Sequence, residues 1–263
     1  MKKRIETYDE EIKKAQELKS NATTSREKLL CEKDFILPQL LEILKGRRLV
    51  CIRAIGIGTL YRFNPCFTTT SALQLTLVLF IKQHFPEAIV TYQELEVHEI
   101  ETKWLASKGI TVLPTSDLKT IPHEYVFEDE NAVTLCVKIG LCYFHHENVL
   151  LSYWSLNKMR NFIEISNDYC WGAHKGTVME PYWEELSEKL SFPKLENCNS
   201  FKKCDRQHGR EDENTACVSN AFCYGHLYFT WLKSDVEELP EVVEFQGKHL
   251  VIGDIRNKEN IKK

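Results

Sequence analysis

The stretch CIRAIGIGTLYR, residues 51–62, decides the fold class of this chain. Its first half is an apolar run typical of a buried strand, and it ends in the turn Gly56-Ile57-Gly58. Glycines directly after the first strand of a parallel sheet let the backbone approach a ligand closely. The alternative, in which the glycines only end the strand, stays open, because the dinucleotide fingerprint needs a third glycine where Tyr61 stands.

Strand and helix patterns alternate on the C-terminal side of this stretch. The helix expected at 70–84 is apolar nearly all round, with Thr70 or Ser71 available as its N-cap. The other expected elements are strands at 88–92, 110–113, 132–139 and 161–166, and helices at 96–109 and 147–157. This alternation predicts an α/β fold with a Rossmann-like, doubly wound, mainly parallel sheet and its first strand in a central position.

The remaining sequence suggests one such domain with additions at both ends. Residues 1–28 are interpreted as a charged N-terminal helix and linker, and 29–255 as the α/β domain, with its core at 48–170. A further peripheral helix ends at Gly46. The expected C-terminal features are a helix at 181–190, a polar insertion at about 196–216, an aromatic strand within 219–232, a hairpin at 242–255 and a tail at 256–263.

Composition excludes some classes of function. The chain has 263 residues, of which 43% are hydrophobic and 27% charged, and its net charge is -4, so no basic surface favours nucleic acid. The N-terminus lacks the apolar core of a signal peptide, and the longest apolar stretch, 73–81, is too short to cross a bilayer. We therefore expect a cytoplasmic or nuclear protein with reduced cysteines that acts through protein partners and not on membranes.

The order of motifs resembles the SRR-like family, named for sensitivity to red light reduced. The family pattern places Gly-hydrophobic-Gly after the first strand, Gln-Leu in the next helix, Tyr-Asp-Pro after the second strand, Pro-His-Cys after the fourth and Gly-Asn-Ser-Phe after the last core strand. The residues that match or replace these motifs here are Gly56, Gly58, Ser71, Gln74, Leu75, Tyr92, Gln93, Glu94, Glu101, Gly109, Gly140, Leu141, Cys142, Asn148, Leu150, Tyr153, Trp154, Ser166, Asn167, Asp168 and Tyr169. A closing aromatic segment matches 222–231.

This resemblance implies a regulatory protein without assured catalytic activity. Members of the family are linked to haem biosynthesis regulation and to circadian or light signalling. Two polar positions of the pattern differ here, since Gln93 replaces the acid after the tyrosine and Leu141 replaces the histidine. The main prediction is therefore regulation through partners or a sensed ligand.

The first alternative is a Rossmann-like enzyme that uses a nucleotide or S-adenosylmethionine. Glu94 is the candidate acid for a ribose hydroxyl, because it follows the second strand. The expected ligand-binding cleft at the carboxyl ends of the strands comprises Gly56, Gly58, Tyr92, Glu94, Cys142, His145 and Asn167. Neither a phosphate-binding loop nor a nucleophile elbow occurs, and the pair Cys142 and His145 has no evident third catalytic group.

The second alternative is a haem- or zinc-binding protein. His145 and His146 are candidate haem or metal ligands, although two histidines near the start of a helix are more often exposed side chains. Potential zinc ligands gather late in the chain, at Cys198, Cys204, His208, Cys217, Cys223 and His226. Their spacing exceeds that of common zinc knuckles, so structural cysteines of a reduced protein remain the simpler interpretation.

Overall fold

The computed structural model describes residues 9–10, 35–58, 65–94, 97–113, 125, 127, 129–139, 141, 143–167, 177–192 and 227–257. Seven strands form one sheet in the order β3-β2-β1-β4-β5-β7-β6. They are β1 (Arg48–Ile55), β2 (Ile89–Gln93), β3 (Ile110–Val112), β4 (Ala132–Val137), β5 (Phe162–Asn167), β6 (Ser187–Ser191) and β7 (Leu227–Leu232). The first five strands are parallel, and β7 runs antiparallel to both of its neighbours. The predicted mainly parallel, Rossmann-like sheet with a central first strand is confirmed.

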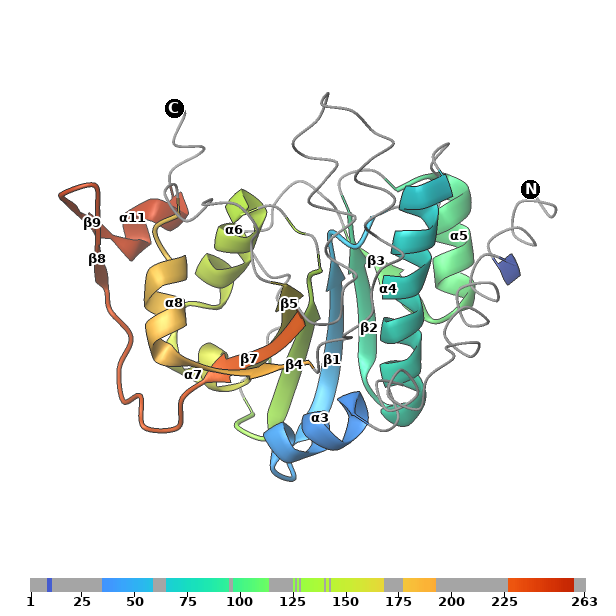
Figure 1. Ribbon diagram of the computed structural model, residues 1–263, viewed down its shortest axis with the longest axis horizontal. Coiled ribbons are helices and arrows are strands. Elements are labelled where there is room, and N and C mark those ends of the chain that lie inside the picture. The colour runs from blue at the N-terminus through green and yellow to red at the C-terminus, as the bar shows by residue number, and fades with distance from the viewer. Residues whose placement is uncertain are drawn as a thin grey trace.

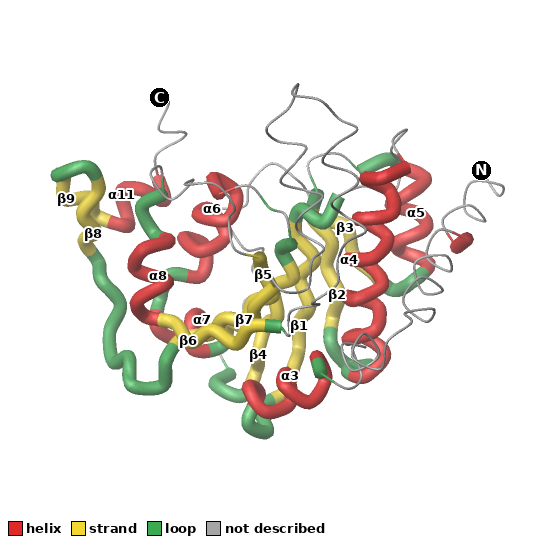
Figure 2. The backbone as a smooth tube through the Cα atoms, in the orientation of Figure 1, coloured by secondary structure: helices red, strands yellow, loops and turns green. Residues whose placement is uncertain are grey.

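Helices cover both faces of the sheet (Figures 1 and 2). One face carries α3 (Ile36–Leu44), α4 (Pro65–His84) and α5 (Glu99–Ser107), whose buried side chains share one apolar cluster with the sheet. The opposite face carries α6 (Tyr143–Tyr153), α7 (Leu156–Arg160) and α8 (Glu180–Leu186) in a second cluster. Strands β4 and β5 are buried along their whole length, as expected for parallel strands covered on both sides.

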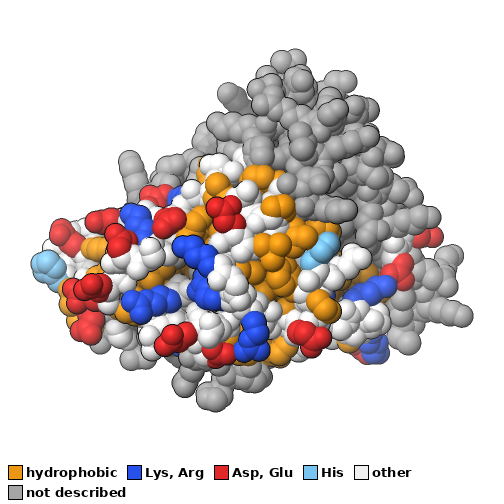
Figure 3. Space-filling view, turned by 90° about the horizontal axis from the view of Figure 1, so that it is seen from below, with side chains coloured by type: hydrophobic (Ala, Val, Ile, Leu, Met, Phe, Trp, Pro, Cys, Tyr) orange, Lys and Arg blue, Asp and Glu red, His pale blue; other side chains and the backbone are white. Residues whose placement is uncertain are grey.

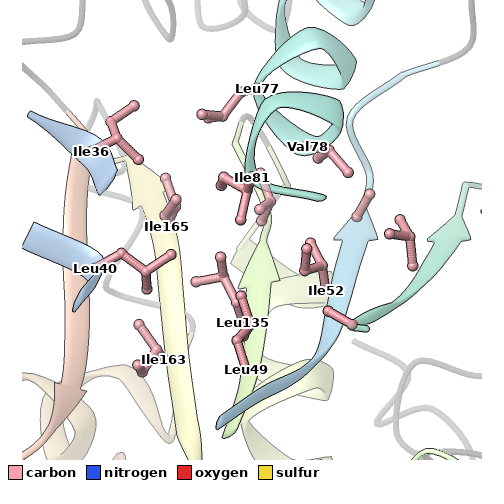
Figure 4. Close-up of a cluster of buried hydrophobic side chains, with 14 of the residues drawn as sticks. Ile36, Leu40, Leu49, Ile52, Leu77, Val78, Ile81, Leu135, Ile163 and Ile165 are labelled. Atoms are coloured by element: carbon pink, nitrogen blue, oxygen red, sulfur yellow. The ribbon is translucent and has the colours of Figure 1, made fainter. Parts of the chain in front are cut away.

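The core of the first face is built by side chains from distant parts of the sequence. Figure 4 shows Ile36 and Leu40 of α3 against Ile163 and Ile165 of β5, while Ile81 of α4 lies over the middle of the sheet. All five are at most 1% exposed.

Several predicted boundaries are wrong, for physical reasons. Thr70 lies inside α4, which begins at Pro65, so neither Thr70 nor Ser71 is the N-cap. The helix expected at 181–190 ends at Leu186, and the rest is β6, because Ser187–Ser191 finds a ladder partner in β7 that the local pattern does not reveal. The helix expected at 147–157 is divided into α6 and α7.

The C-terminal hairpin is confirmed, but residues 252–255, which the prediction includes in it, form the start of a helix. Strands β8 (Val242–Phe245) and β9 (Lys248–Val251) pair antiparallel across Gln246 and Gly247, which both have positive φ angles. The hairpin is followed by α11 (Ile252–Asn257), which packs against α6 and lies beside it in Figure 1.

The amino ends of the parallel strands form the face shown in Figure 3, where apolar side chains gather near the centre and charged ones surround them. The exposed large hydrophobic side chains of the described residues include Leu41 of α3 and Ile89 of β2. No described helix combines the length and hydropathy needed to cross a bilayer.

Candidate functional site

The strand order places a switch point between β1 and β4. From β1 the chain proceeds outward through β2 and β3, and it then returns to the other side of β1 with β4 and β5. In sheets of this kind, ligands bind beyond the carboxyl ends of the strands at the switch point. The register sets Ala54 beside both Tyr92 of β2 and Val137 of β4, so the ends of three strands meet there.

The turn after β1 is tied to the end of β2 by hydrogen bonds. The backbone N–H of Gly58 donates to Glu94 Oε2 at 2.7 Å, and the hydroxyl of Tyr92 donates to the carbonyl of Gly58 at 2.7 Å. The N–H of Gly56 donates to the carbonyl of Gln93 at 2.9 Å. The structure therefore brings together Gly56, Gly58, Tyr92 and Glu94, as the sequence predicts.

The two glycines are required by the packing of the chain itself. Both have positive φ angles, 64° at Gly56 and 86° at Gly58. A Cβ atom would overlap the side chain of Leu141 at the first position and the hydroxyl of Ser71 at the second. The ligand cleft that the sequence places here stays a prediction, but the conformation of the turn is explained.

The other predicted cleft residues lie on neighbouring elements at this edge. Asn167 is the last residue of β5 and is buried, whereas His145 is half-buried in the first turn of α6. Cys142 lies outside the described residues, as do the candidate zinc ligands Cys198, Cys204, His208, Cys217, Cys223 and His226. In the described part of the chain, no group of three or more His, Cys, Asp or Glu side chains is arranged to hold a metal ion.

Arg53 in β1 is a buried arginine close to the turn after that strand, and the sequence analysis did not single it out. Arg53 of β1 is 1% exposed, and its guanidinium donates to Tyr153 Oη at 2.9 Å and to Gln93 Oε1 at 3.0 Å. Its Nε has no hydrogen-bond partner, and no carboxylate among the described residues forms an ion pair with it. Arg53 therefore anchors α6 and the end of β2 through neutral partners.

Two buried thiols lie near this guanidinium. Burial raises the pKa of the Cys51 thiol to about 12, with Arg53 opposing the shift and Cys136 adding to it. Burial likewise raises the pKa of Cys136 and of the Tyr153 hydroxyl. All three groups are therefore neutral at physiological pH, and neither thiol is prepared to act as a nucleophile.

The raised pKa of Cys51 predicts a loss of stability in alkali. The unfolded thiol ionises near pH 8.5, so the stability that Cys51 contributes is complete below that pH and declines as the pH rises toward 12. We expect the free energy of unfolding of Cys51→Val to fall less steeply than that of wild type between pH 8 and 10, by up to about 1.4 kcal/mol per pH unit. Urea unfolding at both pH values measures this, and parallel slopes for the two proteins would contradict it.

A second buried group surrounds one carboxylate at the ends of β4 and β5. Glu164 Oε2 lies 2.5 Å from Lys138 Nζ and 3.5 Å from His146 Nε2. Glu164 Oε1 accepts hydrogen bonds from Trp183 Nε1 at 3.1 Å and from Ser166 Oγ at 3.2 Å. We call these five residues the carboxylate cluster; its three ionisable side chains are at most 3% exposed.

The sequence contains a signal for both buried groups that our interpretation left unused. Arg53, Lys138 and Glu164 are charged residues within or directly after runs that the pattern assigns to buried strands. Charged side chains are almost never fully buried unless they are paired. A charge in a strand that is covered on both faces therefore indicates an internal polar network, although sequence alone does not reveal its partners.

Comparison with known proteins was informative only at the level of structure. No protein-family model and no curated protein matches the sequence. Among the solved structures that match is a mutant of MtNAS, at 12% identity and a TM-score of 0.38, with 86% of this chain and 71% of that chain covered. Another is precorrin-6y C5,15-methyltransferase from Geobacter metallireducens, at 10% identity and a TM-score of 0.36, with 81% and 94% covered. A third is the plantazolicin methyltransferase BamL in complex with a substrate analogue and SAH, at 10% identity and a TM-score of 0.37, with 88% and 98% covered.

Our main functional prediction is not supported by these comparisons, and we correct it. The solved structures that match include methyltransferases, and no finding supports a regulatory protein without catalytic activity or a link to haem biosynthesis or circadian signalling. We therefore withdraw that interpretation. At TM-scores below 0.5 the similarity carries no functional argument, so the function has to be derived from the residues of this chain.

Proposed function

We propose that this protein is a Rossmann-like enzyme that binds S-adenosylmethionine and transfers its methyl group. The observation that carries the proposal is the bond between Gly58 and Glu94, which sets a carboxylate against a glycine turn at the switch point of the sheet. An acid in this position holds ribose hydroxyls in nucleotide-binding sheets. The antiparallel β7 between β5 and β6 also differs from the classic strand order of dinucleotide-binding domains and agrees with a Rossmann-like methyltransferase fold.

The residues at this edge fit an adenosyl group better than a dinucleotide. The third glycine of the pyrophosphate motif is Tyr61 here, and S-adenosylmethionine has no phosphate that would need that turn. Gln74 of α4 is 3% exposed, and its Oε1 has no hydrogen-bond partner among the described residues. A buried acceptor without a donor is costly, and the bound cofactor offers several N–H groups.

Three residues are assigned to the cofactor under this proposal. The carboxylate of Glu94 would accept ribose hydroxyls, the turn at Gly58 would lie beside the ribose, and the amide of Gln74 would accept an N–H group. The bound cofactor would supply an electrophilic methyl group on a sulfonium. The protein contributes binding, orientation and the exclusion of water.

Replacing Glu94 by glutamine tests the proposal. The amide keeps an oxygen that can accept the Gly58 N–H, so the turn is retained while the charged acceptor for the ribose is lost. Hydrogen bonds to charged groups contribute about 1.5–3 kcal/mol, which predicts a 10- to 100-fold weaker affinity for S-adenosylhomocysteine in Glu94→Gln. Isothermal titration calorimetry with S-adenosylhomocysteine measures this difference.

Glu99 provides a matched control for this experiment. It lies in the first turn of α5 with its side chain 80% exposed, so Glu99→Gln makes the same chemical change at a side chain that faces solvent. We expect its affinity to equal that of wild type. Equal affinity in Glu94→Gln and Glu99→Gln, or no binding of S-adenosylhomocysteine to wild type, would overturn the proposed function.

A further inference from the structure

The carboxylate cluster lies one strand away from the proposed cofactor site. Lys138 directly follows β4, the neighbour of β1, and its backbone N–H donates to the carbonyl of Ile165 in β5 at 3.0 Å. His146 belongs to the N-terminal part of α6, which begins at the carboxyl end of β4. The cluster and the pair Gly58 and Glu94 therefore occupy the same edge of the sheet, on either side of the switch point.

Each oxygen of the Glu164 carboxylate has a different role within the cluster. Trp183 and Ser166 donate to Oε1 and fix the orientation of the group, while Lys138 and His146 approach Oε2. Among the side-chain types of this cluster, histidine is the one whose charge ordinarily changes near neutral pH. A fixed carboxylate beside an imidazole orients the ring and stabilises its protonated form.

Burying these charged groups costs free energy of solvation, which suggests that the network has a role other than stability. An apolar side chain of similar volume at both Lys138 and Glu164 would often be as stable as the ion pair. Titratable groups with specific charged partners at the edge of a sheet where ligands bind are candidates for proton transfer. At 2% exposure, the imidazole of His146 is shielded from bulk water.

Resting on the proposed function, we propose that His146 is the general base of the methyl transfer and that Glu164 and Lys138 are its positioning residues. A base of this kind serves an acceptor that loses a proton as it attacks, and we assign a hydroxyl compound as that acceptor. Its O–H bond breaks, the proton passes to His146, and the oxygen forms the bond to the methyl carbon. The carbon–sulfur bond of the donor breaks at the same time and leaves a neutral thioether. Glu164 stabilises the imidazolium that forms.

The protonation of His146 is tested without any substrate. In protein labelled with 15N-histidine, the His146 signals are assigned by their loss in His146→Gln. We expect them to titrate between pH 5 and 9, with a midpoint that moves to lower pH in Glu164→Gln. Among the described residues, the charged groups near this imidazole are Glu164 of β5 and Lys138, which directly follows β4, while α8 contributes the neutral indole of Trp183.

Loss of Glu164 alone leaves Lys138 buried without its counter-charge, so the single variant can fail to fold. The double variant Lys138→Met, Glu164→Gln removes both charges and leaves no unpaired charge buried. Because the cation is lost together with the anion, we expect its midpoint to move to lower pH by less than in Glu164→Gln. An imidazole that stays in one protonation state from pH 5 to 9, or a midpoint unchanged in the variants, would overturn the proposal.

The catalytic role is tested by the rate of S-adenosylhomocysteine formation with phenol, catechol and tyramine as acceptors. General base catalysis contributes 10²- to 10⁴-fold, so we expect kcat to fall by at least 100-fold in His146→Gln while the affinity for S-adenosylhomocysteine stays unchanged. His84→Gln, the same change at an exposed histidine of α4, should retain full activity. Full activity in His146→Gln, or no methylation of any of the three, would contradict the proposal. If wild type binds no S-adenosylhomocysteine, the proposed function fails, while the histidine titration still reports on His146 as a proton acceptor.

Discussion

Lys138→Met is expected to destabilise the protein by about 3–5 kcal/mol, because it leaves the carboxylate of Glu164 buried without a cation. Methionine fills a similar volume, so the loss reports on charge and not on a cavity. Lys138 is fully buried and Glu164 is 2% exposed, so water cannot replace the missing partner. Urea unfolding followed by circular dichroism measures the change.

The double variant Lys138→Met, Glu164→Gln separates charge from packing. Its amide keeps an oxygen for the donors Trp183 and Ser166, and no net charge stays buried. We expect it to recover most of the lost stability, since replacing a buried ion pair by neutral groups is often neutral or stabilising. If both variants lose the same free energy, the account of the cluster as a compensated ion pair is wrong.

Gly58→Ala is expected to lower the free energy of unfolding by about 3 kcal/mol. A left-handed backbone costs a non-glycine residue about 1–2 kcal/mol, and Gly58 has a φ angle of 86°. The added methyl group would also overlap the Ser71 hydroxyl, and overpacking of this kind costs about 1–3 kcal/mol. Thermal and urea unfolding give the magnitude.

Gly46 supplies the matched control for this effect. Its φ angle is 84°, but a Cβ atom there would meet nothing within 4 Å. Gly46→Ala should therefore lose only the conformational part, about 1–2 kcal/mol. The double variant Ser71→Ala, Gly58→Ala should lose about the same free energy of unfolding as Gly46→Ala. Equal losses in the two single variants would show that the contact with Ser71 has no energetic weight.

The parallel strands and most of the helices could be predicted from the sequence, but the edge strand β6 could not. Apolar runs such as residues 49–55 predict buried parallel strands, because such strands are covered on both faces. The strand Ser187–Ser191 is polar and pairs only with β7, so its identity depends on a partner far away in the chain. Local patterns carry no information on pairing of that kind.

Only part of the candidate site could be predicted from the sequence, because the rest depends on contacts between distant parts of the chain. Chain order alone brings Gly58 and Glu94 to one edge, because each lies within three residues of the end of one of two neighbouring parallel strands. The carboxylate cluster joins β4, β5, α6 and α8, and no spacing in the sequence links Lys138 with Trp183. The resemblance to a regulatory family led to a function that no comparison with known proteins supports.

The central claim is that the edge formed by Gly58 and Glu94 binds an adenosyl cofactor. A crystal structure of the protein grown with saturating S-adenosylhomocysteine tests it most directly. The account predicts density for the nucleoside beside the turn after β1, with the ribose hydroxyls within hydrogen-bond distance of the Glu94 carboxylate. Density at another place in the molecule, or none at this edge under saturating conditions, would contradict it.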